Sequence, residues 1–215
     1  MRARILTLHI LGAASMLLAT ACTTVGVRTG VEEPPYSRVA QFDDIEVRRY
    51  GERIAAQTLV RGTDEAARRE GFDRLAGYIF GANGPGGHLA GQVAAAGPQS
   101  RTIAMTAPVA QDPAHDDIWR VAFFMPRIFR LSDLPEPHNP KVSLEVVPAQ
   151  TFAVLRFSGA RDAAAVRTHK ARLLSQLSGA GWRAAGEPVA WFFDPPWTVP
   201  LMRRNEVAVQ VEPKP

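Results

Sequence analysis

The feature that most constrains the fold of this chain is an internal repeat. The segment "IEVRRYGERIAAQTLVRG" matches "LEVVPAQTFAVLRFSG" of the second half, with Ile45-Glu46-Val47 aligned on Leu144-Glu145-Val146. In the same order, "TIAMTAP" matches "VAWFFDPP", and "DIWRVAFFMP" matches "NEVAVQVEP". A spacing of roughly a hundred residues indicates a duplicated half-domain and not a solenoid, whose units are about 20–50 residues long.

Each copy is predicted to contain two strands, a helix and two more strands. Alternating apolar residues in "IEVRRY" and "ERIAAQTLV" predict a hairpin that turns at Tyr50-Gly51. Thr63 is suited to cap the first helix, which is expected to stop at Gly81. The second copy has its own apolar stripe, from Val166 to Leu177. One copy alone cannot bury its apolar faces, so we predict a single α+β body with both helices packed on the sheet.

Two matching strands, one in each copy, are expected to end at proline. "TIAMTAP" ends at Ala107-Pro108, and "VAWFFDPP" ends at Pro195-Pro196. Proline has no backbone N–H to donate to a sheet. The sheet is therefore expected to open at both places and to leave a mouth, which is where barrel-like sheets tend to hold pockets.

The first residues are predicted to be a secretory signal peptide, residues 1–21. Arg2 and Arg4 precede an apolar run, and small residues precede Cys22. "LATAC" resembles the bacterial lipobox, which predicts lipidation of Cys22, and Thr23 favours the outer membrane, facing the periplasm. The alternative is an ordinary cleaved signal with an incidental cysteine.

The remaining chain is predicted to be a lipidated tether, residues 22–35, followed by a single domain, residues 36–213. The halves of that domain span about 36–126 and 141–213. Cys22 is the only cysteine, so no intramolecular disulfide can form. Without Arg2 and Arg4, the 25 basic residues become 23 against 21 acidic ones, a formal charge of +2. That balance does not suit a nucleic-acid partner.

Several motifs together resemble the SOUL haem-binding family over about Tyr36 to Glu212. They are "EVRRYGERIAAQT", "IAMTAPV", "FSG" and "FDPPW" with "RRNEV". The resemblance implies a pseudo-twofold, distorted β-barrel of two ββαββ repeats, similar to the effector-binding domains of multidrug-sensing regulators and to gyrase-inhibitor proteins. It also implies haem or another tetrapyrrole as a ligand, bound without a covalent link in a shallow apolar surface pocket.

The same resemblance implies a set of ligand-binding residues on the first helix, after it and at the second proline break. A flat macrocycle gains about 25 cal/mol per Å² of apolar surface buried, and an arginine suits its propionates. Alternatively, the apolar helix positions and Met105 are core residues, and the helix arginines are solvated. The implied residues are Arg68, Arg69, Phe72, Leu75, Ala76, Ile79, Met105 and Trp197.

The segment 81–100, "GANGPGGHLAGQVAAAGPQS", is longer than the corresponding loop of the family. It is either a flap over the pocket or filler. His88 within it is a weak candidate for a haem ligand. No histidine or cysteine spacing resembles a haem-attachment or zinc motif, so no metal site is assigned.

The chain is predicted not to be an enzyme, because it has no Gly-x-Ser-x-Gly nucleophile motif. One alternative is a hydrolase of a small electrophile that uses Glu46 or Glu145 in the same pocket, since gyrase-inhibitor-like proteins include hydrolases. Another alternative is a structural or partner-binding module of the cell envelope.

Overall fold

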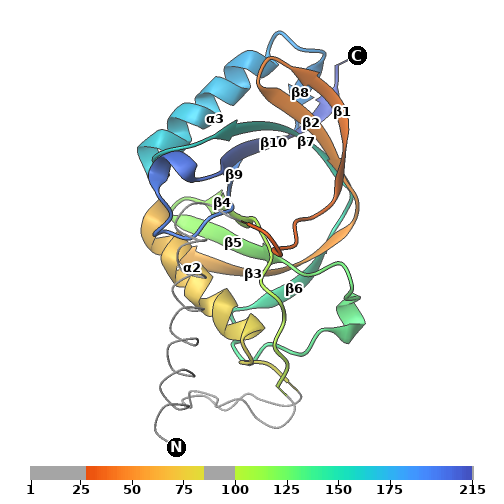
Figure 1. The fold of residues 1–215 in the computed structure, drawn as a ribbon, viewed down its shortest axis with the longest axis vertical. Helices are drawn as coiled ribbons and strands as arrows, with labels where there is room; N and C mark the ends of the chain where they lie inside the picture. The colour runs from red at the N-terminus through yellow and green to blue at the C-terminus, as the bar shows by residue number, and fades with distance from the viewer. Residues whose placement is uncertain (1–27, 85–99, 215) are drawn as a thin grey trace, which may run out of the picture.

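The computed structural model describes residues 28–84 and 100–214. It contains a ten-stranded antiparallel sheet that curls into an open barrel, with helices α2 and α3 on its outer side (Figure 1). The predicted signal peptide, Cys22 and His88 lie outside the described residues. The first half contributes β1 (Tyr36–Phe42), β2 (Ile45–Tyr50), β3 (Arg53–Arg61), α2 (Asp64–Ile79), β4 (Val109–His115) and β5 (Ile118–Phe124).

The second half repeats the series from β2 onward, without a counterpart of β1 and with β8 added after its helix. It contributes β6 (Ser143–Val147), β7 (Gln150–Phe157), α3 (Ala163–Leu177), β8 (Trp182–Ala184), β9 (Val189–Phe192) and β10 (Asn205–Pro213). Short 3-10 turns, η1 (Leu131–Asp133) and η2 (Pro200–Met202), lie in the connections. The counterparts in the two repeats are β2 and β6, β3 and β7, β4 and β9, and β5 and β10. Exchanging each strand for its counterpart turns the order β2-β7-β10-β9-β4-β5-β3-β6 into the same order read from the opposite end. The predicted pseudo-twofold α+β fold is therefore confirmed, with its axis between β4 and β9.

The predicted hairpin of "IEVRRY" and "ERIAAQTLV" is wrong. β2 pairs with β7, for example Ile45 with Leu155, and β3 pairs with β5 and β6, for example Ala55 with Glu145. The first strand of each repeat thus joins the sheet of the other repeat. Alternation of apolar residues identifies a strand but carries no information about its partner.

The two proline breaks meet at one seam between the halves. Val109 of β4 pairs with Phe192 of β9, and the ladder of hydrogen bonds between β4 and β9 ends at this pair. "VAWFFDPP" ends as a strand at Phe192, as predicted, whereas "TIAMTAP" does not form one, because β4 begins only after Pro108. Pro108 directly precedes β4 and offers no donor there, whereas β9 stops three residues before Pro195, and the Phe193 N–H donates to the Arg204 carbonyl at 3.3 Å.

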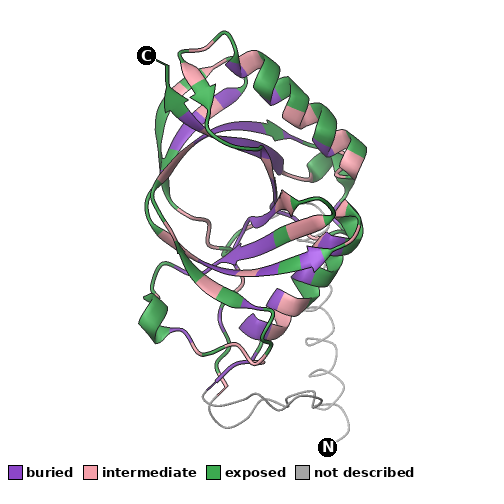
Figure 2. Ribbon diagram, turned by 180° about the vertical axis from the view of Figure 1, so that it is seen from behind, coloured by how far each residue is buried: buried purple, intermediate pink, exposed green. Residues whose placement is uncertain are grey.

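Two of the three core clusters lie between the sheet and a helix, and the third lies inside the barrel. α3 packs Val166, Leu173 and Leu177 on the sheet. α2 packs Leu75 and Ile79 on β5 in the same way. The outer sides of both helices remain largely exposed (Figure 2). Each helix therefore uses one face for packing, as amphipathic helices do.

Residues 28–35, which were predicted to be part of a tether, pack on the barrel, and we call them the strap. The Ala107 N–H donates to the Glu32 carbonyl at 2.9 Å, on the side of the first half. Arg28 pairs with Asp194 at 3.0 Å, on the side of the second half. β1 follows the strap directly and was not predicted, because most of its side chains are exposed and show no alternation.

Candidate functional site

The helix residues predicted to touch a ligand fall into two groups. Leu75 and Ile79 are 0% and 1% exposed and pack with Val121 and Phe123 under α2. Their side chains face the sheet, so they contribute to the core and reach no surface pocket. Met105 is half-buried against the same cluster.

The remaining helix residues lie on the accessible flank of α2. Phe72 is 38% exposed and sets its ring edge-on to Phe123, with the centroids 5.3 Å apart. Ala76 is half-buried and Arg69 is exposed. This flank can touch a ligand without any movement of the helix.

Arg68 points from α2 to the place where the two halves meet. Its guanidinium donates to Asp64 at 2.8 Å and to Gln111 at 3.0 Å. It also lies over the ring of Phe192, 4.5 Å from the centroid. A third bond, 3.5 Å long, runs from Arg68 to the backbone carbonyl of Arg161. We call Arg68, Arg161 and Arg203 the arginine junction.

Two members of the arginine junction have no acidic partner. Arg161 donates to the Asp194 carbonyl at 2.8 Å, and Arg203 donates to the carbonyls of Pro196 and Thr198, both at 2.8 Å. Among the described residues, neither forms an ion pair within 4.0 Å; the Asp194 carboxylate raises the pKa of Arg161 only as its smallest influence and is itself paired with Arg28. Burial, followed by the charges of Arg68 and Arg203, lowers the pKa of Arg161 to about 10. An anion bound here would relieve this repulsion.

Large apolar side chains project from the loop that carries Arg203, residues 193–204, which we call the proline loop. Leu201 is 81% exposed and Trp197 is 62% exposed, and Val199 and Met202 are exposed as well. The two carbonyls that Arg203 holds belong to the residues on either side of Trp197. Such a group of exposed apolar side chains is typical of a surface that binds something.

Two of the predicted site residues, Arg68 on α2 and Trp197 on the proline loop, therefore lie at or near the arginine junction, although they are far apart in sequence. Arg161 and Arg203 were missed. Arg203 lies in "PLMRRNEV", which reads as a solvated strand edge, and only the folded chain shows that it is half-buried beside Arg161.

The described histidines do not form a metal site. No group of three or more His, Cys, Asp or Glu side chains converges within residues 28–84 and 100–214. His169 stacks on Phe157 with ring centroids 3.9 Å apart, and burial lowers its pKa. Likewise, none of the helices in this part of the chain is long and apolar enough to span a bilayer.

Comparison with known proteins identifies both a family and a fold. The model of the family described as "SOUL heme-binding protein" matches residues 31–210. The crystal structure of the EcmrR C-terminal domain is similar, with 14% identity, a TM-score of 0.56, and coverage of 83% of this chain and 98% of that chain. EcmrR in its complex with DNA gives 14% identity and a TM-score of 0.55, covering 99% of this chain and 70% of that chain.

A hydrolase from Listeria innocua is similar at 11% identity, with a TM-score of 0.49 and coverage of 81% of this chain and 94% of that chain. A sequence comparison with curated proteins found no match. At these identities, the two EcmrR structures show the effector-binding-domain-like fold and nothing more.

Proposed function

Because this chain belongs to the SOUL haem-binding protein family, we propose that it binds haem or a related tetrapyrrole reversibly, without a covalent bond, at the arginine junction and the proline loop. The observation that carries the proposal is a combination of two features. Arg161 and Arg203 form no ion pair, and exposed apolar side chains lie on the loop that carries Arg203.

The chemistry of this surface suits the two parts of such a ligand. Arg161 and Arg203 offer planar donors for the two propionates, and charge-assisted bonds of this kind are the stronger ones. Trp197 and Leu201 offer apolar area to the macrocycle, which contributes about 25 cal/mol per Å² buried. The site is open to solvent, which favours exchange of the ligand over permanent retention.

Titration of the purified protein with haemin tests the proposal. The wild type should give a saturable Soret shift with a Kd in the micromolar range or below. The Arg161→Gln/Arg203→Gln double variant should bind at least about tenfold more weakly, since each charged hydrogen bond contributes about 1.5–3 kcal/mol. Arg49→Gln is the matched control, because Arg49 is exposed on β2, away from the junction. Unsaturable absorbance growth, or equal affinity in the double variant, would refute the proposal.

We propose binding and not catalysis as the activity. Glu46, one of the two candidate acids, accepts a bond from Arg48 at 2.7 Å and is thereby held in an ion pair. Glu145, the other, is exposed on β6 beside Ser143, on the side of the molecule remote from the proline loop. Model esters should therefore turn over no faster with the wild type than with Glu46→Gln or Glu145→Gln. A rate that either substitution abolishes would favour the hydrolase.

We also propose that the protein is anchored in the outer membrane through Cys22, on the basis of the lipobox-like "LATAC". Two acyl signals give stable membrane attachment, whereas one chain gives only marginal attachment. The mass of the N-terminal peptide from the native membrane should show an acylated Cys22, and Cys22→Ser should move the protein to the soluble fraction.

A pigment that co-purifies with the protein would support haem binding, whereas a stoichiometric protein partner without pigment would favour a structural module.

A further inference from the structure

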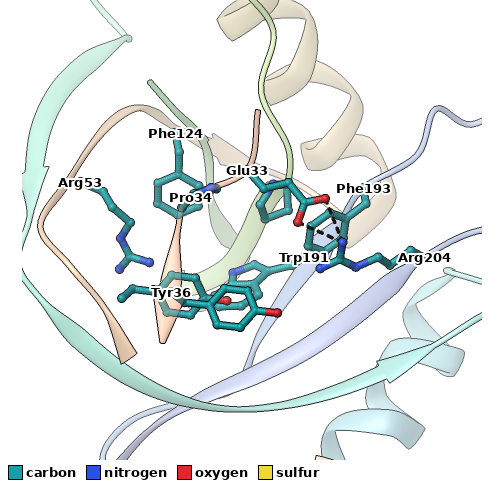
Figure 3. A pocket seen from close by; sticks show the side chains of 10 residues that line it. Glu33, Pro34, Tyr36, Arg53, Phe124, Trp191, Phe193 and Arg204 are labelled. Carbon is teal, nitrogen blue, oxygen red and sulfur yellow. Dashed lines mark hydrogen bonds and ion pairs between the residues drawn. The ribbon is translucent and has the colours of Figure 1, made fainter. Parts of the chain in front are cut away.

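The inside of the barrel holds a group of aromatic rings that we call the aromatic chamber. Tyr36, Tyr50, Phe124, Trp191 and Phe193 line it, and Figure 3 shows Glu33 and Pro34 of the strap against them. Tyr50 packs edge-on to Trp191, with centroids 5.6 Å apart. The free volume left in the chamber is about 10 Å³, enough for about one water molecule.

A buried ion network beside the chamber is balanced in charge. Glu206 is fully buried and accepts bonds from Arg48 at 2.8 Å and from Arg204 at 3.0 Å. Arg48 also donates to Glu46 at 2.7 Å. Two arginines and two glutamates thus neutralise one another, as buried charges must.

The strap adds a third carboxylate to this network, and Arg38, whose Nε lies 4.0 Å from Glu46, adds a third arginine, so the extended network remains balanced in charge. Arg204 donates to both oxygens of Glu33, at 2.8 and 3.0 Å. The Arg204 guanidinium also stacks on Phe193, 3.7 Å from the ring centroid. Glu33 is therefore committed to Arg204, and Figure 3 shows this pair at one side of the chamber, with Arg53 at the other.

Arg53 has no acidic partner within the described parts of the chain. Its guanidinium donates to Gln150 at 2.8 Å and lies over the rings of Tyr50 and Phe124, at 4.8 and 5.1 Å. Its Nε is buried without a hydrogen-bond partner. Desolvation by burial lowers its pKa to about 10. A half-buried cation held by two rings and one neutral amide, with a donor unsatisfied, is arranged to receive an anion.

A second hollow lies on the other side of the strap and shares Glu33, Pro34, Arg53 and Phe124 with the chamber. Its volume is about 330 Å³, within the range of about 300–1,000 Å³ that is usual for small-molecule sites. Apolar side chains line much of it, and its remaining charged residues, two acidic and two basic, balance one another. The other apolar residues that line it are Pro35, Ile54, Met125, Pro126, Phe129, Leu131 and Val146, and the balancing pairs are Glu32 and Glu52 with Arg127 and Arg130.

We propose that this hollow, which we call the strap hollow, is a second binding site, for a small molecule that carries a carboxylate on an aromatic ring. Arg53 binds the carboxylate, and Phe124, Phe129 and Met125 bind the ring. A cation would meet an uncompensated guanidinium, and a neutral ligand would leave that guanidinium unpaired. The Glu33 carboxylate in the wall of the hollow opposes an incoming anion and sets the affinity.

Calorimetric titration of the purified protein with 1-naphthoate and with its neutral analogue, 1-naphthamide, tests this inference. Naphthoate should bind at least about tenfold more tightly than the amide, as expected for a charge-assisted pair with Arg53. Arg53→Gln should remove this preference. Glu33→Gln should strengthen naphthoate binding about threefold or more, because it removes a like charge from the wall. Arg49 is exposed on β2, only four residues before Arg53 in the sequence, and Arg49→Gln should change nothing.

Equal binding of naphthoate and naphthamide to the wild type would overturn the proposal, and this comparison needs no variant to fold. Naphthoate affinity unchanged in a folded Arg53→Gln would overturn it as well. The inference does not depend on the haem proposal. The Arg161→Gln/Arg203→Gln double variant should lose haem and keep naphthoate binding, whereas Arg53→Gln should do the opposite, so either proposal can fail alone.

Discussion

Gly71 occupies the point of closest approach between α2 and the sheet. A methyl group added to its Cα would lie 2.6 Å from the side chain of Val121, closer than two non-bonded carbon atoms normally approach. Gly71→Ala should therefore lower the free energy of unfolding by about 1–3 kcal/mol through overpacking. Alanine's higher helix propensity, which contributes about 1 kcal/mol, offsets part of this cost.

Gly77 provides the control on the same helix, since nothing lies within 4 Å of the methyl group that alanine would add there. Gly77→Ala should raise stability by about 0.5–1 kcal/mol. Urea denaturation of both variants measures the difference. A Gly71→Ala variant as stable as Gly77→Ala would show that the helix can move away from β5.

Burial raises the pKa values of Tyr50 and Tyr78 to about 12. The folded state thus favours the neutral phenols, whereas the unfolded chain ionises them near pH 10. Their contribution to stability is complete below about pH 10 and is lost as the pH rises toward 12. These two phenols therefore lower the free energy of unfolding across this interval, whereas Arg53 and Arg161, whose pKa values burial lowers to about 10, act in the opposite direction there. Urea denaturation at a series of pH values measures the net slope, and the comparison with a tyrosine variant isolates the contribution of the phenols.

Tyr78→Phe should make that alkaline decline shallower. The substitution removes one of the two raised phenols, together with its hydrogen bond to the Pro135 carbonyl, so stability at neutral pH should also drop by about 1 kcal/mol. If the slope above pH 10 stays as steep as in the wild type, Tyr78 does not contribute to the decline.

Among elements, α3 depends on a side chain that precedes it. Asp162 accepts a hydrogen bond from the Ala165 N–H at 2.9 Å and so caps the helix. Asp162→Ala should cost about 1 kcal/mol, whereas Asp162→Asn should cost little, because asparagine caps nearly as well. Thermal unfolding distinguishes the two variants. Equal losses would mean that the charge of Asp162 matters and its capping bond does not.

The sequence predicted the ends of a helix well, because capping residues act on the backbone within a few positions along the chain. Thr63 caps α2 and Gly81 follows it with a positive φ of 114°, both as predicted. Strand partners depend on residues far along the chain, so the β2–β3 hairpin was predicted wrongly and β1 was missed.

The candidate site shows the same limit. Helical spacing marks Phe72, Leu75 and Ile79 alike as apolar, and only packing shows that Phe72 is accessible while the other two are core. The arginine junction combines Arg68, Arg161 and Arg203, which come from a helix and two separate loops. No local pattern in the sequence links them, and the family resemblance pointed to Arg68 and Trp197 but not to Arg161 or Arg203.

At the scale of the whole molecule, the exchange of strands makes the two halves interdependent. In the first half alone, β1-β2 and β4-β5-β3 would form two sheets without a shared hydrogen bond, because β7, β10 and β9 join them in the intact chain. Fragments 28–127 and 128–214 should each lack the dispersed amide NMR signals of a folded protein. Mixing the two should restore such signals, and a folded 28–127 fragment on its own would contradict the expectation.

This exchange also fixes the order in which the chain can mature. During synthesis β2 emerges about a hundred residues before β7. The edge of β2 that pairs with β7 therefore stays without a partner strand until the second repeat has been synthesised. When two nascent chains are close, β2 of one can pair with β7 of the other in the same register that the two strands have within one chain. The connection from 125 to 142 is the hinge about which such reciprocal dimers would form, so its length decides how readily the two halves close on each other within one chain.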